Sequence, residues 1–189
     1  RIFWSYKVGL VLKLENKNVL ITGAANRIGR EIAISLSKLG FNIGIHYNSS
    51  ESSANQTLKL VKKNKVEASI IQSDLSNEKN CTKLIKDTEK KIGEVSILIN
   101  NASTFKKNTL ENTSSREIEE DFYVNLIAPF ILCKAIFRKS NKGKVINISD
   151  WKTARTNRFS YGVSKAAIYG LTKSLSLSMA SGSWLRVHW

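Results

Sequence analysis

The sequence predicts an α/β fold, a doubly wound parallel sheet of the Rossmann type with helices on both faces. Three observations lead to this prediction. Short apolar runs rich in β-branched residues alternate five times with amphipathic helical patterns, the connections between them are short, and a glycine-bracketed turn follows the first run. The chain has 189 residues, of which 42% are hydrophobic, so it is long enough to bury the core of one such domain.

The first predicted strand is a continuous apolar run, and the first predicted helix has an apolar stripe at helical spacing. Residues 17–23 (KNVLITG) form a β-branched apolar run that ends in glycine, as a buried strand does. In residues 27–40, four apolar side chains recur on one helical face and a glycine supplies the stop. The four side chains are Ile28, Ile32, Leu36 and Leu39, and the glycine is Gly40.

The same alternation predicts the remaining elements. Strands are expected at 41–47, 66–72, 95–103 and 143–149, and helices at 51–64, 77–93, about 114–139 and about 160–179. Residues 183–189 have the character of a sixth strand just beginning. Because a doubly wound sheet normally continues past that point, we expect the chain to be truncated in its sixth strand. Residues 1–12 are interpreted as an extension or fragment edge, and residues 13–189 as one C-terminally incomplete domain.

Composition narrows the possible partners and compartment. Thirty Lys and Arg against fifteen Asp and Glu give a formal charge of +15, which favours anionic ligands. The cations are spread along the chain, so most are interpreted as solvated helix faces, and binding of nucleic acid is not expected. Cys81 and Cys133 are isolated, without metal-ligand or redox spacing, which indicates buried thiols in a reducing compartment and no metal site. No run reaches the roughly 18 apolar residues of a membrane span, so a cytoplasmic protein without a membrane partner is expected.

The turn TGAANRIG, residues 22–29, joins the first strand to the first helix. Gly23 and Gly29 bracket it, and glycine lets a phosphate approach the backbone closely. The start of the helix adds free N–H groups and a partial positive charge. After the first strand of a βαβ series, this turn favours dinucleotide binding.

The end of the second predicted strand indicates which dinucleotide. An NAD site usually has a carboxylate there, for the ribose 2′-hydroxyl. Here Tyr47, Asn48, Ser49 and Ser50 stand in its place. Hydroxyl donors together with the cation Arg27 suit a 2′-phosphate, so the sequence favours NADP(H) over NAD(H).

Tyr161 and Lys165 lie four positions apart at the start of the last predicted helix, so they share one face. A lysine ammonium near a tyrosine favours the phenolate and lowers the pKa of the phenol. Such a pair can donate a proton to a carbonyl or imine while a nicotinamide delivers hydride. A tyrosine and a lysine at this spacing also occur on many helices by chance.

The four motifs TGAANRIG, NNAS, VN and YGVSK together resemble the short-chain dehydrogenase/reductase family, in the same order and over about residues 14–188. The resemblance implies that Tyr161 is the general acid, that Lys165 lowers its pKa and holds the nicotinamide ribose, and that Asn125 orients a water relay. It also implies a set of cofactor contacts. These are Gly23, Arg27, Ile28, Gly29, Tyr47, Asn48, Ser49, Asp74, Leu75, Asn101, Ala102 and Lys165.

Within this family the sequence is most similar to the pteridine reductases, because Asp150 stands where most members have a serine. Arg27 and the stretch NNASTF agree with that subgroup. The resemblance implies that Ser103 and Phe105 cradle and stack on a pterin, and that Arg27, Asp150 and Tyr161 also contact the substrate. A buried Asp150 with a raised pKa could then supply a proton beside Tyr161. Two alternatives stay open: Ser149 takes the serine role while Asp150 caps a loop, or Phe105 only packs the loop.

The resemblance leaves several functions open. A reductase of a pterin or of another carbonyl or imine compound is expected, with a 3-oxoacyl thioester reductase as the main alternative and a non-catalytic nucleotide-binding fragment as another.

The segment between Asp150 and Tyr161 is about two residues shorter than in the family, so the loop over the site is expected to lie differently. A homo-oligomer is expected for the full-length protein.

Overall fold

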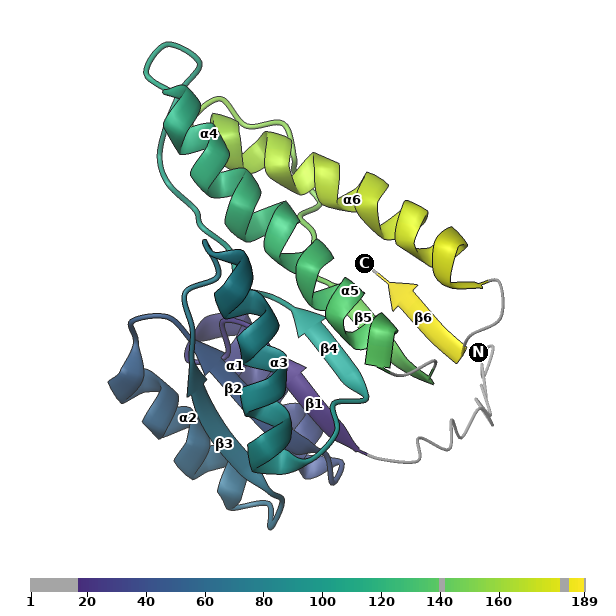
Figure 1. Ribbon diagram of the computed structural model, residues 1–189. Helices are drawn as coiled ribbons and strands as arrows, with labels where there is room; N and C mark the ends of the chain where they lie inside the picture. The colour runs from purple at the N-terminus through teal and green to yellow at the C-terminus, as the bar shows by residue number, and fades with distance from the viewer. Residues whose placement is uncertain (1–16, 140–141, 181–183, 189) are drawn as a thin grey trace, which may run out of the picture.

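The computed structural model describes residues 17–139, 142–180 and 184–188. Residues 1–12, interpreted above as an extension, lie outside the described residues, as do residues 13–16. The described chain forms a six-stranded sheet in the order β3-β2-β1-β4-β5-β6, and every neighbouring pair of strands is parallel (Figure 1). The order reverses between β1 and β4, which is where doubly wound sheets bind their ligands. The predicted fold class is confirmed.

The elements begin and end close to the predicted positions. The strands are β1 (Asn18–Ile21), β2 (Asn42–Tyr47), β3 (Ala68–Gln72), β4 (Ile97–Asn100), β5 (Lys142–Asn147) and β6 (Trp184–His188). The helices are α1 (Arg27–Lys38), α2 (Glu51–Lys62), α3 (Glu78–Ile92), α4 (Ser115–Phe122), α5 (Ala128–Lys139) and α6 (Phe159–Ala180). A π-helical turn, η1 (Tyr123–Ile127), joins α4 to α5, so the long helix predicted for residues 114–139 contains a local bulge.

Two apolar layers cover the two faces of the sheet. Leu20 and Leu98 point into the layer that contains side chains of α3 and α5, whereas Val19 and Ile21 point into the layer that contains side chains of α1 and α2. This alternation follows from the two-residue period of a strand. A strand that is buried on both faces needs a continuous apolar run, and the burial of all four β1 residues agrees with that.

The predicted core face of α1 is partly wrong. Ile32 and Leu36 pack against the apolar layer, but Ile28 and Leu39 are 62% and 66% exposed. The fully buried positions are Gly29, Ala33 and Ser37. Small residues occupy this face because the helix lies close to the sheet where it leaves the glycine turn.

Within the described residues, no helix is long and apolar enough to cross a membrane.

Candidate active site

The glycine turn between β1 and α1 is held by close packing. Gly23 has φ +63°, in the left-handed region that favours glycine. A Cβ on Gly29 would lie 2.4 Å from the carbonyl oxygen of Gly23 and 2.6 Å from the Asn101 side chain. Asn101 Nδ2 donates to the carbonyl oxygens of Thr22 and Gly23, at 2.9 and 3.1 Å. The end of β4 therefore fixes the turn from the neighbouring strand.

His46, at the end of β2, supports the same turn. Its Nδ1 accepts a hydrogen bond from the Gly23 N–H at 3.0 Å, and its Nε2 lies 3.0 Å from the Ser73 carbonyl oxygen. This pairing requires a neutral ring with the proton on Nε2. Burial lowers the pKa of His46 to about 4, against the opposing effects of the Ser73 carbonyl and the Asp74 charge. His46 is thus a structural residue of the turn.

A cavity of about 750 Å³ extends from the glycine turn to Tyr161, along the carboxyl ends of the central strands. Most of the predicted site residues line it. They are Gly23, Arg27, Ile28, Gly29, Asn48, Asp74, Leu75, Asn101, Ala102, Ser103, Phe105, Asp150, Tyr161 and Lys165. Arg27 adopts φ +50°, which is uncommon for a residue other than glycine and is often associated with functional sites.

Three predicted residues do not line this cavity. The Tyr47 side chain is buried in the core beside α1 and α2, and the exposed Ser49 lies beyond the end of β2. Asn125 is buried in the π-helical turn. Its Nδ2 donates to Ser164 Oγ at 2.9 Å and its Oδ1 accepts from the Thr104 N–H at 2.9 Å. Asn125 therefore joins the loop after β4 to helix α6.

The catalytic candidates meet at the start of α6. The Tyr161 hydroxyl donates to Asp150 Oδ2 at 2.7 Å. Arg155 Nη2 donates to the same oxygen at 2.8 Å, and the Lys152 N–H donates to Asp150 Oδ1 at 2.9 Å. Lys165 Nζ donates to the carbonyl oxygen of Ile148 at 2.7 Å. The structure therefore brings Asp150, Tyr161 and Lys165 to one wall of the cavity, as predicted.

The expected raised pKa of Asp150 is wrong for this arrangement. Burial raises the pKa of the carboxyl, but hydrogen bonds from the Lys152 N–H, Tyr161 and Arg155, with the charge of Arg155, outweigh burial and lower it. Asp150 is therefore an ionised acceptor, and the shared proton lies on Tyr161.

The expected lowering of the Tyr161 pKa by Lys165 is also wrong. Burial first, and then the hydrogen bond and charge of Asp150, raise the pKa of Tyr161 well above its ordinary value. Burial lowers the pKa of Lys165 to about 8, against the opposing charge of Asp150. Because the carboxylate contacts the phenol directly while Lys165 Nζ lies 6.0 Å from the ring centroid, the carboxylate has the larger effect.

The short segment between Asp150 and Tyr161 packs directly on α6. A Cβ on Gly162 would lie 2.1 Å from the carbonyl oxygen of Thr153. Only glycine allows this contact, which holds the loop beside Tyr161. Arg155 Nε donates to the Lys152 carbonyl oxygen at 2.9 Å, so the loop also carries an internal hydrogen bond.

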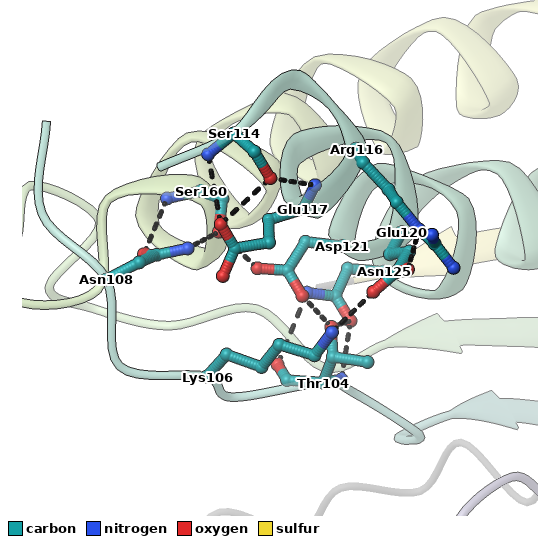
Figure 2. Close-up of polar contacts among 10 residues, drawn as sticks. All are labelled: Thr104, Lys106, Asn108, Ser114, Arg116, Glu117, Glu120, Asp121, Asn125 and Ser160. Atoms are coloured by element: carbon teal, nitrogen blue, oxygen red, sulfur yellow. Dashed lines mark hydrogen bonds and ion pairs between the residues drawn. The ribbon is translucent and has the colours of Figure 1, made fainter. Parts of the chain in front are cut away.

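A buried carboxylate links the loop after β4 to helix α6. Asp121, on α4, is fully buried and accepts hydrogen bonds from the hydroxyls of Thr104 and Ser160 (Figure 2). Ser160 Oγ also accepts from Asn108 Nδ2 at 2.6 Å. Thr104 precedes Phe105 and Ser160 precedes Tyr161, so this network fixes the backbone next to Phe105 relative to the backbone next to Tyr161.

Phe105 lies against the ring of Tyr161. The two ring centroids are 4.6 Å apart with an interplanar angle of 81°, an edge-to-face contact. Phe105 is 45% exposed and lines the cavity, so it does more than pack its own loop. Ser103 is exposed on the same loop and donates through Oγ to the Thr104 carbonyl oxygen at 2.9 Å.

Sequence reasoning missed Arg155 and Asp121. Arg155 contacts Asp150, and Asp121 contacts Thr104 and Ser160, and none of these pairs has the spacing of a helix or strand period. Of the two, Arg155 could have been suspected because it lies five residues after Asp150, within reach of a turn, whereas nothing in the sequence around Asp121 distinguishes it from the neighbouring acidic residues of α4.

Comparisons with known proteins agree on one family. The family model described as short chain dehydrogenase matches residues 17–188. Among curated proteins, the 3-oxoacyl-(acyl-carrier-protein) reductase FabG of Staphylococcus epidermidis is 30% identical over 171 residues, which cover 88% of this chain and 70% of that protein.

Two solved structures illustrate the similarity of fold. FolM alternative dihydrofolate reductase 1 from Brucella canis, complexed with NADP, superposes with a TM-score of 0.83 at 30% identity, over 91% of this chain and 70% of that chain. Acetoin dehydrogenase YohF from Salmonella typhimurium superposes with a TM-score of 0.81 at 28% identity, over 87% of this chain and 71% of that chain. These relatives differ in the substrates that their names state.

Proposed function

Because the chain belongs to the short-chain dehydrogenase family, we propose that it is an NADPH-dependent reductase of a pteridine, either a dihydropterin or a dihydrofolate. One observation carries the choice of substrate: Tyr161, whose hydroxyl donates to Asp150, lies in edge-to-face contact with Phe105, and both rings line the cavity. A flat heteroaromatic ring suits an aromatic wall, and a ring nitrogen under reduction needs a nearby proton donor. The name of the similar Brucella structure, a dihydrofolate reductase complexed with NADP, supports the same choice.

The glycine turn fits the phosphates of the proposed cofactor. A Cβ on Gly29 would collide with the Gly23 carbonyl oxygen and the Asn101 side chain, so glycine at this position keeps the turn tightly packed at the start of α1. Its N–H groups, at the start of α1, would hold the pyrophosphate. Arg27 and Asn48 line the cavity and would bind the 2′-phosphate, and no carboxylate stands at 48–50 to repel it.

The rest of the cavity would hold the adenine and the nicotinamide ribose. Asp74 and Leu75 lie in the part of the lining that would contact the adenine, and Asn101 and Ala102 follow β4 at the centre of the sheet edge. Lys165 would hold the ribose hydroxyls. When bound, NADPH supplies a hydride to the substrate.

The chain's own residues would supply the proton. Tyr161 holds its proton firmly in the free protein, because burial and Asp150 raise the pKa of the phenol. It would give that proton to the substrate nitrogen or oxygen as negative charge develops there. The charges of Arg155 and Arg158, which lower the pKa of Tyr161 against burial and Asp150, would stabilise the phenolate that remains.

The test is NADPH oxidation by the chain with dihydropterin or dihydrofolate, compared with an acetoacetyl thioester. Turnover of the pteridines supports the proposal. Selective turnover of the thioester would favour the second candidate, a 3-oxoacyl thioester reductase, as the name of the curated relative suggests. NADPH binding without turnover of any substrate would favour a non-catalytic module.

Replacement of Tyr161 by Phe tests the proposed acid. Because the variant lacks the proton donor, we expect turnover to fall by about 10²- to 10⁴-fold. The dissociation constant for NADPH should change by less than about twofold, since the hydroxyl is directed at Asp150. Turnover equal to that of the unmodified chain would remove Tyr161 from the mechanism.

A further inference from the structure

Two loops border the cavity beside Tyr161, and their backbones are joined. One follows β4 and contains Phe105, and the other follows β5 and leads into α6. An isolated parallel bridge pairs Asn108 with Arg158. The Phe159 N–H donates to the Asn108 carbonyl oxygen at 3.2 Å, and Asn108 Nδ2 donates to Ser160 Oγ at 2.6 Å. This pairing sets Arg158 directly beside the loop that carries Phe105.

Arg158 holds Phe105 at two points. The centre of its guanidinium lies 3.7 Å from the centroid of the phenyl ring, the distance of a stacked cation–π contact. Its Nη1 also donates to the carbonyl oxygen of Phe105 at 2.7 Å. The first contact orients the ring and the second fixes the backbone of the same residue, so ring and loop cannot turn independently.

The held ring is placed for substrate contact. A guanidinium covers part of its surface and the edge-to-face contact with Tyr161 covers more, while Phe105, 45% exposed as a whole residue, is among the residues that line the cavity. The guanidinium of Arg155 also lies 5.9 Å from the ring centroids of Phe105 and Tyr161, so a second cation is near both rings. An aromatic ring that is held in one orientation loses less entropy when a ligand stacks on it.

We propose that Arg158 is a specificity-determining positioning residue, which clamps Phe105 so that the ring forms a fixed platform beside Tyr161 for a flat heteroaromatic substrate. The inference rests on the proposed function, since it deepens the choice of a pteridine over an aliphatic 3-oxoacyl compound. An aliphatic carbonyl needs only the proton donor and gains little from a fixed aromatic face.

The experiment measures kcat and KM of the chain for dihydropterin and for an acetoacetyl thioester, with the NADPH dissociation constant as a readout of folding. The variants are Arg158→Met, Arg158→Lys, Phe105→Leu and the double variant Arg158→Met with Phe105→Leu. The matched control is Arg116→Met, since Arg116 lies on α4, is 86% exposed and pairs with Glu120 away from the cavity.

We expect Arg158→Met to raise KM for dihydropterin about tenfold, the equivalent of about 1.4 kcal/mol, with kcat changed less than about twofold. KM for the thioester and the affinity for NADPH should not change. Arg158→Lys should recover less than half of the loss on a logarithmic scale, because an ammonium lacks the planar fork of a guanidinium. If Arg158 acts through Phe105, the double variant should be no worse than Phe105→Leu alone.

Three results would overturn the inference. In the first, Arg158→Met and Arg116→Met have the same KM for dihydropterin. In the second, the losses of Arg158→Met and Phe105→Leu add up in the double variant. In the third, Arg158→Met raises KM equally for dihydropterin and for the thioester. A chain that never turns over a pteridine would instead refute the proposed function, and the specificity assigned to Arg158 with it. The two failures are distinguishable because the first keeps dihydropterin turnover and the second lacks it.

Discussion

Replacement of His46 by Gln should change how the stability of this protein depends on pH. His46 is 2% exposed, and it binds the Gly23 N–H and the Ser73 carbonyl only as a neutral ring. A glutamine side chain offers an amide oxygen and an amide N–H for the same two partners but cannot gain a proton. The substitution therefore removes a titration while it keeps both hydrogen-bonding roles.

The magnitude follows from the two pKa values of the ring. In the fold, burial lowers the pKa of His46 from its ordinary 6.5 to about 4. Below pH 6.5 the unfolded chain binds the proton and the folded chain does not, so stability falls as pH decreases. The contribution of His46 is fully present above about pH 7.5, and about 2 kcal/mol of it is lost by pH 5 and about 3 kcal/mol by pH 4.

The assay is urea unfolding of the chain and of the His46→Gln variant at about pH 8, 6.5 and 5, with the free energy of unfolding extrapolated to water. The two proteins differ only at residue 46, so the difference between the two curves isolates His46. The unmodified chain should lose about 2 kcal/mol more than the variant between pH 8 and pH 5. Equal losses in the two proteins would refute a buried neutral ring at this position.

Two further predictions concern the loop beside Tyr161. Gly162→Ala should destabilise the chain by about 1–3 kcal/mol and reduce turnover, because the added methyl group collides with the loop backbone. The control is Gly170→Ala, whose Cβ would meet no neighbouring segment within 4 Å; it should be neutral or stabilise α6 by up to about 1 kcal/mol. Thermal unfolding of both variants checks this, and equal effects would contradict the proposed contact. Arg155→Met should move the acid limb of kcat/KM to higher pH, because it removes a cation that lowers the pKa of Asp150. A pH–rate profile measures the limb, with Arg155→Lys as the control that keeps the charge, and an unmoved limb would show that Arg155 does not set the ionisation of Asp150.

Local patterns account for most of the correct predictions. The continuous apolar run of residues 17–23 and the glycines that follow predicted the first strand and the turn after it. The spacing of Tyr161 and Lys165 predicted that they share a face of α6, since four residues make about one helical turn. These properties depend on neighbours in the chain, and so they can be read without coordinates.

Contacts between distant segments account for the errors. Ile28 and Leu39 match a helical stripe, but the approach of α1 to the glycine turn buries Gly29 and leaves both apolar side chains exposed. Packing between distant segments also decided the position of Tyr47: its side chain is buried in the core, and the cofactor contact expected for it stays a prediction.

The sequence by itself determined the element order, the parallel sheet, the glycine turn and the residue types available for proton transfer. Only the tertiary structure decided the charges within the site. It placed the Lys152 N–H, Tyr161 and Arg155 on Asp150, which together lower the pKa of its carboxyl, and it placed that carboxyl, not Lys165, in direct contact with the phenol of Tyr161. The physical reason is that a pKa depends on burial and on charges a few ångströms away, and those distances are set by how loops far from one another in the chain pack together.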